Sequence, residues 1–270
     1  MPCEVSGPLP GAGTTDETLR YDGGMTTYGI WAGLYVGSVV VLMFRILGQP
    51  VSVAAVIGSV FLAMAVYVLH RMSPEVNDAM QKRHYQALFQ RKTMLFLFGL
   101  ASIVASGMLY IAEPYLLFLL PIGCIAVTLY GRKTVCYPIR NILYLKPIAV
   151  GGSIAVLGWV LTGTPWPPLA ALGLAIIVTA DAVLCDIPDI AYDKACGCTT
   201  FAAKTRTSTT WTIALFANTI AASFLWFVCQ SVMGWVILIA FPLLFLLRKF
   251  NLRIWVDLRL PLVAVIAWTL

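Results

Sequence analysis

The sequence predicts an all-α protein: a polytopic membrane bundle of about nine transmembrane helices. The first observation is composition: 60% of the 270 residues are hydrophobic, 11% are charged, and the mean hydropathy is +0.87. Soluble domains carry about 25% charged residues. The second is that apolar runs of about 20 residues, the length of a membrane-spanning helix, recur along the chain. The third is that basic residues are confined to alternate loops.

The apolar runs define the expected helices. Eight are expected at about 26–47, 51–70, 94–112, 115–130, 147–163, 168–185, 208–228 and 231–247. The stretch 94–130 is too long for one span at about 1.5 Å per residue. Glu113-Pro114 divides it, because proline does not continue a helix. Further tight turns are expected at Gln49-Pro50, at the proline-rich stretch 164–168 and at Gln230.

A ninth, weaker segment is expected at about 251–270. Its uninterrupted apolar part, 260–270, has 11 residues, about half the length of a span. We consider two explanations. Either the helix begins near Asn251 and carries charged residues such as Arg259 to the membrane interface, or the native chain continues past Leu270.

The distribution of basic residues predicts the orientation in the membrane. Loops after the second, fourth, sixth and eighth helices hold 16 of the 18 Lys and Arg residues, and the loops between them hold none. By the positive-inside rule, the basic loops and the N-terminus are expected in the cytosol. This topology also explains the net charge of +6 and the pI of about 9.0, so nucleic acid is not an expected partner.

Two further features of the sequence, the N-terminal segment and the cysteines, are not assigned a functional role. Residues 1–24 are polar and rich in Gly and Pro, and we expect a disordered cytosolic tail before a membrane domain at 25–270. The seven cysteines lack the paired CxxC spacing of a zinc site. We interpret them as small side chains that fill the core.

Carboxylates gather in the loop after the sixth helix. Asp186, Asp189 and Asp193 are spaced i, i+3, i+7, which places them within about 60° on one helix face. Clustered carboxylates repel one another unless a cation lies between them, and Mg²⁺ binds carboxylate and phosphate oxygens. The alternative is a solvated acidic helix end that Lys194 and Lys204 balance. We favour a metal site, because four of the protein's 12 acidic residues lie within thirteen positions here.

The loop after the second helix, residues 70–84, is the second candidate. Ser73 and Pro74 predict the N-cap and first position of a short helix. Glu75 and Asp78 then share one face of that helix. Taken alone, this pattern is explained by compensation of the helix dipole.

A third loop follows the fourth helix and is basic. It runs from Tyr130 to Lys146 and also contains Tyr137, Arg132, Lys133 and Arg140. Its cations are explained equally well by topology and by binding of a diphosphate.

Taken together, the loops resemble those of the UbiA-type intramembrane prenyltransferases, a superfamily of helical membrane enzymes with aspartate-rich cytosolic loops after the second and sixth helices. The resemblance covers most of residues 26–270. The second loop follows the family pattern D-x-x-D-x-x-x-D-R…G-x-x-T…R at Asp186, Asp189, Asp193, Lys194, Gly197, Thr200 and Lys204. Tyr130 and Lys146 fit the tyrosine and lysine of the loop after the fourth helix.

The first loop departs from the family pattern. The family's N-x-x-x-D-x-x-x-D falls on His70, Pro74 and Asp78, so only the last aspartate is kept. Two explanations stay open: the first site holds its ion weakly, or it holds none and uses basic side chains on the diphosphate. Three more family positions differ, since a tyrosine, a lysine and a glycine fall on Ala182, Cys185 and Arg206.

The resemblance implies a reaction and a set of site residues. In the family, Mg²⁺ on the two loops grips an allylic diphosphate, the isoprenoid tail lies between helices open to lipid, and loss of diphosphate leaves a carbocation. The implied catalytic and metal-binding residues are Asp186, Asp189, Asp193 and Asp78, with Glu75 as a replacement ligand. The implied diphosphate contacts are Arg71, Lys82, Arg83, Lys133, Arg140, Lys146, Lys194 and Lys204. The implied substrate pocket contains His70, Tyr130 and Tyr137.

The leading hypothesis is therefore a Mg²⁺-dependent prenyltransferase. It would move an isoprenyl group from a polyprenyl diphosphate to a lipophilic acceptor, which we expect to be aromatic, within the bilayer. A membrane terpene cyclase would use the same ionisation and capture the cation within its own substrate. A non-catalytic isoprenoid-binding relative is favoured by the incomplete first motif. A transporter is disfavoured because the expected helix interiors lack ionisable residues.

Overall fold

The described part of the chain is helical apart from short turns. The structure, a computed structural model, describes residues 29–72, 90–131, 142–165, 168–195, 200–247 and 252–269. No strand occurs in these ranges. The predicted all-α class is confirmed, and the predicted tail at 1–24 lies outside the described residues.

Each expected apolar segment has a helical counterpart close to its expected ends. The long helices are α2 (Ile30–Ile46), α3 (Val53–Met72), α6 (Arg91–Ala112), α7 (Leu119–Gly131), α8 (Leu145–Leu161), α9 (Leu169–Cys185), α12 (Thr207–Phe227), α13 (Met233–Leu247) and α14 (Leu252–Thr269). The short ones are η1 (Pro114–Phe118), η3 (Ile187–Asp189), α10 (Ile190–Ala195) and α11 (Phe201–Lys204). The predicted break at Glu113 is confirmed, because that residue is extended and ends α6.

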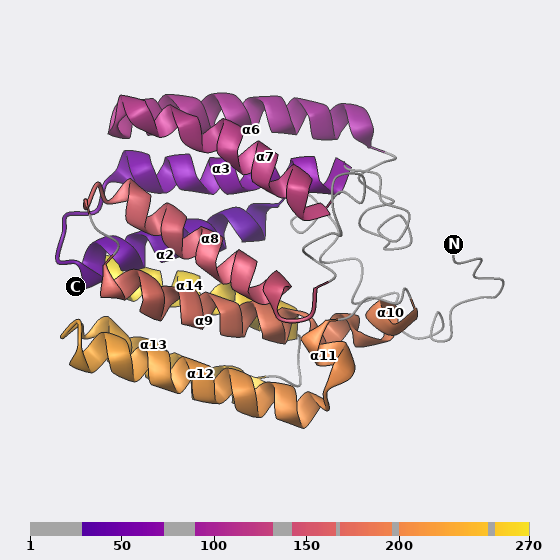
Figure 1. Cartoon of the computed structure of the whole chain (residues 1–270). Coiled ribbons are helices and arrows are strands. Elements are labelled where there is room, and N and C mark those ends of the chain that lie inside the picture. The colour runs from indigo at the N-terminus through magenta and orange to yellow at the C-terminus, as the bar shows by residue number, and fades with distance from the viewer. Residues whose placement is uncertain are drawn as a thin grey trace.

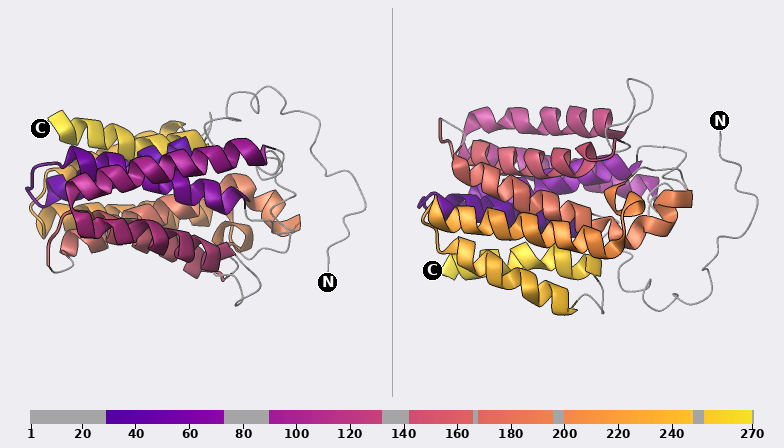
Figure 2. Two further views of the ribbon diagram at one scale, coloured as in Figure 1. Left: turned by 90° about the horizontal axis from the view of Figure 1, so that it is seen from above. Right: turned by 60° about the horizontal axis from the view of Figure 1, so that its bottom comes forward.

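The long helices lie side by side in one bundle (Figures 1 and 2). The helix α2 is central and packs against α3, α8, α9 and α14, while α9 also packs against α8 and α12. The short helices α10 and α11 lie at one end of the bundle, and the C-terminus lies at the other (Figure 1).

The outer surface of the bundle is apolar. Large side chains such as Phe96, Ile103, Phe216 and Phe227 are exposed, the last by 74%. Among the described residues, α3, α6, α12 and the stretch Leu169–Asp189 are long and apolar enough to cross a membrane, and the other apolar helices are shorter. An apolar surface of this extent is expected where lipid is the solvent. The chain is a helical membrane bundle, and nine spans remain a prediction.

The last helix corrects one expectation. α14 starts at Leu252, as the first of the two explanations requires. Its Arg259, however, is not an exposed residue near a helix end, because it is 4% exposed and packed inside the bundle. The physical reason is a carboxylate partner on α9, described below.

Candidate active site

The ends of several long helices lie at the end of the bundle where α10 and α11 are found (Figure 1). The C-terminal end of α9 leads into η3 and α10 there, and the N-terminal end of α8 lies beside it, because Lys146 of α8 pairs with Asp186. The C-terminal ends of α3 and α7 meet through His70 and Tyr130, whose ring centroids are 5.9 Å apart. This end of the bundle therefore brings together residues from the three predicted loops: His70 from the first, Tyr130 and Lys146 from the basic loop, and Asp186 from the aspartate loop.

The second aspartate motif is not one regular α-helix, and that expectation was wrong. α9 ends at Cys185, Asp186 is its C-cap, and a 3₁₀ turn follows before α10 begins. The cause is Pro188, which has no N–H to donate back into α9. The Asp189 amide instead donates to the carbonyl of Asp186 at 3.2 Å. The i, i+3, i+7 spacing therefore overstates how closely the three carboxylates share a face.

Asp186 is buried and ion-paired. It is 5% exposed, and the ammonium of Lys146 donates to its Oδ1. The pairing is possible because α8 and α9 approach closely at Gly151, where a Cβ would lie 2.6 Å from the carbonyl oxygen of Ala175. A close approach of this kind needs a residue without a side chain.

Asp193 is buried beside the same cluster. It is 6% exposed and accepts a hydrogen bond of 2.8 Å from the hydroxyl of Thr200. The Thr200 hydroxyl also accepts from the amide of Ala203 and so caps α11. Burial raises the pKa of Asp193, while the Thr200 hydrogen bond and the charge of Lys146 act in the opposite direction.

Aromatic and basic groups of α3 and α7 complete this end of the bundle. Tyr130 lies close enough to Lys146 to interact with it electrostatically. Arg71 is buried, with its guanidinium 4.6 Å from the ring centroid of Tyr67 and bonded to that residue's hydroxyl. His70, Tyr130 and Lys146, which come from α3, α7 and α8, thus lie near one another at this end of the bundle.

The other predicted site residues divide into two groups. Asp189 is half-buried, and Lys194 and Lys204 are not buried, so these two lysines are not part of the buried cluster. The rest lie outside the described residues: Glu75, Asp78, Lys82, Arg83, Lys133, Tyr137 and Arg140.

The donor chemistry at this end suits Mg²⁺. Within the described ranges, no three His, Cys, Asp or Glu side chains are grouped so as to hold a metal by themselves. Mg²⁺ does not require such a group, because it is bound through one or two carboxylates together with water and phosphate oxygens. Asp186 and Asp193 supply oxygens of the required kind.

A second polar cluster was missed by the sequence reasoning. Arg259 of α14 donates to both carboxylate oxygens of Asp181 of α9, at 2.6 and 2.7 Å. Asp181 also accepts from the hydroxyl of Tyr35 at 2.7 Å, and Arg259 donates to Asn218 at 2.8 Å. The expectation of helix interiors without ionisable residues was therefore wrong. The signal in the sequence was an Asp within one apolar segment and an Arg at the edge of another.

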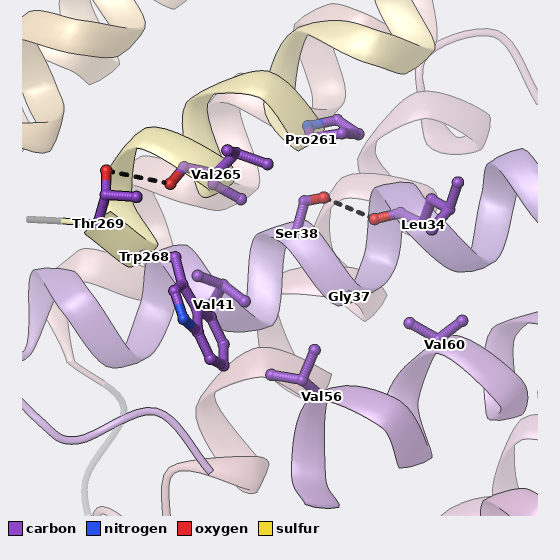
Figure 3. A pocket seen from close by; sticks show the side chains of 11 residues that line it. Leu34, Gly37, Ser38, Val41, Val56, Val60, Pro261, Val265, Trp268 and Thr269 are labelled. Atoms are coloured by element: carbon purple, nitrogen blue, oxygen red, sulfur yellow. Dashed lines mark hydrogen bonds between the residues drawn. The ribbon is translucent and has the colours of Figure 1, made fainter. Parts of the chain in front are cut away.

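An apolar groove opens between α2, α3 and α14 (Figure 3). Its volume is about 400 Å³, and it is lined by groups such as Val41, Val60 and Trp268. The hydroxyls of Ser38 and Thr269 are bonded to carbonyls of their own helices. The groove shares no lining residue with the carboxylate cluster and is suited to hydrocarbon.

Comparison with known proteins relates this geometry to a known fold. No family model and no curated protein matches the sequence. Among solved structures, a UbiA homologue from Aeropyrum pernix K1 in the apo state matches with a TM-score of 0.62 and 15% identity, over 89% of this chain and 98% of that one. A UbiA homologue from Archaeoglobus fulgidus bound to GPP and Mg²⁺ matches with a TM-score of 0.60 and 10% identity, over 91% and 99%. The chain has the UbiA fold. The helical fold that the resemblance implies is thus confirmed by the arrangement of the whole bundle.

Proposed function

We propose that this UbiA-fold protein is a Mg²⁺-dependent prenyltransferase, which transfers an isoprenyl group from an allylic diphosphate to a lipophilic acceptor. The observation that supports this most is that two buried carboxylates, Asp186 and Asp193, lie at one end of the bundle, where the partly exposed Lys146 pairs with Asp186. A homologue of the same fold binds GPP and Mg²⁺. The positive-inside pattern assigns this end to the cytosol.

Each buried group has a role in this proposal. Bound Mg²⁺ would neutralise the diphosphate and stabilise it as a leaving group. Asp186 and Asp193 would supply carboxylate oxygens to the ion, with Asp189 as a further candidate. Asp78 and Glu75 of the first loop are the candidates for completing the site.

Lys146 has two possible anionic partners. In the structure its ammonium is paired with Asp186. The same ammonium could instead donate to the oxygens of a diphosphate and would there stabilise the negative charge that develops on the leaving group. Arg71, on α3, is a buried cation at this end of the bundle.

The reaction moves one electron pair at a time. The allylic C–O bond breaks and its electron pair leaves on the diphosphate. The resulting carbocation accepts an electron pair from the acceptor, which then loses a proton to water. The face of Tyr130 can stabilise such a cation without trapping it as water would.

The test measures diphosphate release by the purified protein supplied with GPP. We expect release with Mg²⁺, loss of release with EDTA, and a prenylated product when a lipophilic aromatic acceptor is added. Asp186→Asn and Asp193→Asn should each reduce the rate by at least about 100-fold. Glu113→Gln changes an exposed carboxylate far from Asp186 and should leave the rate of diphosphate release unchanged.

Other outcomes would assign the protein differently. A hydrocarbon or alcohol formed from GPP without acceptor would indicate the cyclase. Binding of GPP without diphosphate release, unaffected by the two Asp→Asn changes, would contradict catalysis and indicate an isoprenoid-binding relative.

A further inference from the structure

The ion pair between Asp181 and Arg259 lies inside the helix bundle. Their side chains are 3% and 2% exposed. The Arg259 guanidinium donates to both Asp181 oxygens, and the Tyr35 hydroxyl donates a third hydrogen bond to the carboxylate. The proposed reaction uses none of these groups.

The pair is the centre of a cluster that joins five helices. Tyr35 comes from α2, Asp181 from α9, Asn218 from α12 and Arg259 from α14. The Arg259 guanidinium also lies 5.2 Å from the ring centroid of Phe241 in α13. We call Tyr35, Asp181, Asn218 and Arg259 the buried quartet.

Stability alone does not explain the quartet. Removing two charges from water costs about as much as their attraction returns, so apolar side chains of similar volume would hold the same helices together equally well. What hydrogen-bonded charges provide, and apolar contacts do not, is one defined arrangement of partners. Here Nη2 of Arg259 donates to both Asp181 oxygens and Nη1 donates to Asn218, so partners on two helices fix the direction of the guanidinium.

The quartet lies directly beneath the second aspartate motif. Asp181 precedes Asp186 by five residues, or about 7.5 Å along the axis of α9. Between them Cys185 places its sulfur 3.9 Å from the Oδ1 of Asp257, two residues before Arg259. The end of α9 is therefore held against α14 by the quartet and against α8 by the pair of Asp186 with Lys146.

We propose that the buried quartet positions the C-terminal end of α9, and with it Asp186, at the depth and rotation that metal–diphosphate binding requires. Its members are positioning residues, which act through Asp186. This inference rests on the proposed function. It makes that function depend on the buried quartet as well as on the aspartate loops.

The first test removes both charges together, so that neither is left unpaired. The double variant Asp181→Leu with Arg259→Met should melt within a few degrees of the wild type. Its half-saturating Mg²⁺ concentration for diphosphate release should rise by about tenfold, with kcat changed less. Wild-type Mg²⁺ dependence in the folded double variant would overturn the proposal.

A milder pair of variants covers the case in which the double variant does not fold. Tyr35→Phe removes one hydrogen bond without altering a charge and should raise the half-saturating Mg²⁺ concentration by about threefold. Tyr115→Phe, an exposed tyrosine of η1, is the matched control and should have no effect. Equal Mg²⁺ dependence in Tyr35→Phe and the wild type would overturn the proposal.

A cross-linking measurement separates this inference from the proposed activity. With the other native cysteines replaced by serine, Asp257→Cys should form an oxidative cross-link with Cys185. We expect the double variant to slow cross-linking by at least about fivefold, because α9 is no longer held in register with α14. Equal rates would contradict the positioning role. The two proposals can also fail separately. If neither the wild type nor any variant shows Mg²⁺-dependent turnover, but the double variant still slows cross-linking, the proposed function is rejected and the positioning of α9 is retained.

Discussion

Asp193 illustrates how the surroundings of one side chain set its chemistry. Burial raises the pKa of its carboxyl, and the Thr200 hydroxyl opposes this by donating to the charged form. A metal ligand must be deprotonated, so binding is lost as the pH falls through this pKa. The hydroxyl of Thr200 therefore widens the pH range in which Asp193 can bind a cation.

Replacing Thr200 tests this role. Thr200→Val removes a donor to the carboxylate, which raises the pKa of Asp193 further and moves the acidic limb of the pH–rate profile to higher pH. Thr200→Ser keeps the hydroxyl and should keep the profile. Thr212→Val, at an exposed threonine bonded to its own helix, is the control. An unshifted limb in Thr200→Val would show that Asp193 is not a required anion.

At the scale of helices, contact between α8 and α9 brings Lys146 to Asp186. The two helices approach closely at Gly151, where an added Cβ would meet the backbone of α9. The next residue, Gly152, would have nothing within 4 Å of an added Cβ and so faces open space. The two adjacent glycines form a natural matched pair.

Gly151→Val should push α8 away from α9. We expect it to destabilise the fold by about 1–3 kcal/mol, as overpacking does, and to raise the half-saturating Mg²⁺ concentration. Gly152→Val should leave both unchanged. The measurements are the melting temperature in detergent and a Mg²⁺ titration of diphosphate release. Equal behaviour of the two variants would mean that this close contact does not position Lys146.

Element boundaries are predictable where one residue decides them. Glu113-Pro114 ends a helix by local chemistry, and the predicted break is found there. Pro188 carries the same signal inside the second motif, but the i, i+3, i+7 spacing favours one regular helix when it is considered alone. The consequence is an incorrect expectation for the shared face of the three carboxylates.

Pairing across the bundle is not predictable from the sequence. Asp181 and Arg259 are 78 residues apart, and Asp181 and Tyr35 are 146 apart, so no local pattern joins them. From the sequence, Arg259 is counted among the cations of the loop after the eighth helix. The order of residues in the chain does not show which helices lie side by side, so its partner on α9 could not be predicted. The second aspartate motif is recognisable because its residues are neighbours in the chain.

At the scale of the whole molecule, lipid explains most of the surface. Composition is sufficient to predict a membrane bundle, since a surface with large exposed side chains such as Phe227 is stable only against hydrocarbon. The orientation in the membrane is inferred from the distribution of Lys and Arg among the loops. The packing of the helices would be the same in either orientation.

Cysteine labelling tests the orientation. In a cysteine-free background, Val232→Cys lies exposed in the turn between α12 and α13, and Lys194→Cys lies exposed at the opposite end of the bundle. We expect a membrane-impermeant maleimide to label Val232→Cys in intact cells and Lys194→Cys only after permeabilisation. The reverse pattern would place the carboxylate cluster outside the cell and contradict the positive-inside assignment.

Calorimetric titration of the purified protein in lipid nanodiscs with a non-reactive thiolo analogue of GPP tests the central claim most directly. Asp186, Asp193 and Lys146 should form one site for a cation and a diphosphate. We therefore predict binding that requires Mg²⁺, disappears with EDTA, and is weakened at least about tenfold by Asp186→Asn or Asp193→Asn but not by Glu113→Gln. Binding of equal strength without Mg²⁺, or in either aspartate variant, would contradict it.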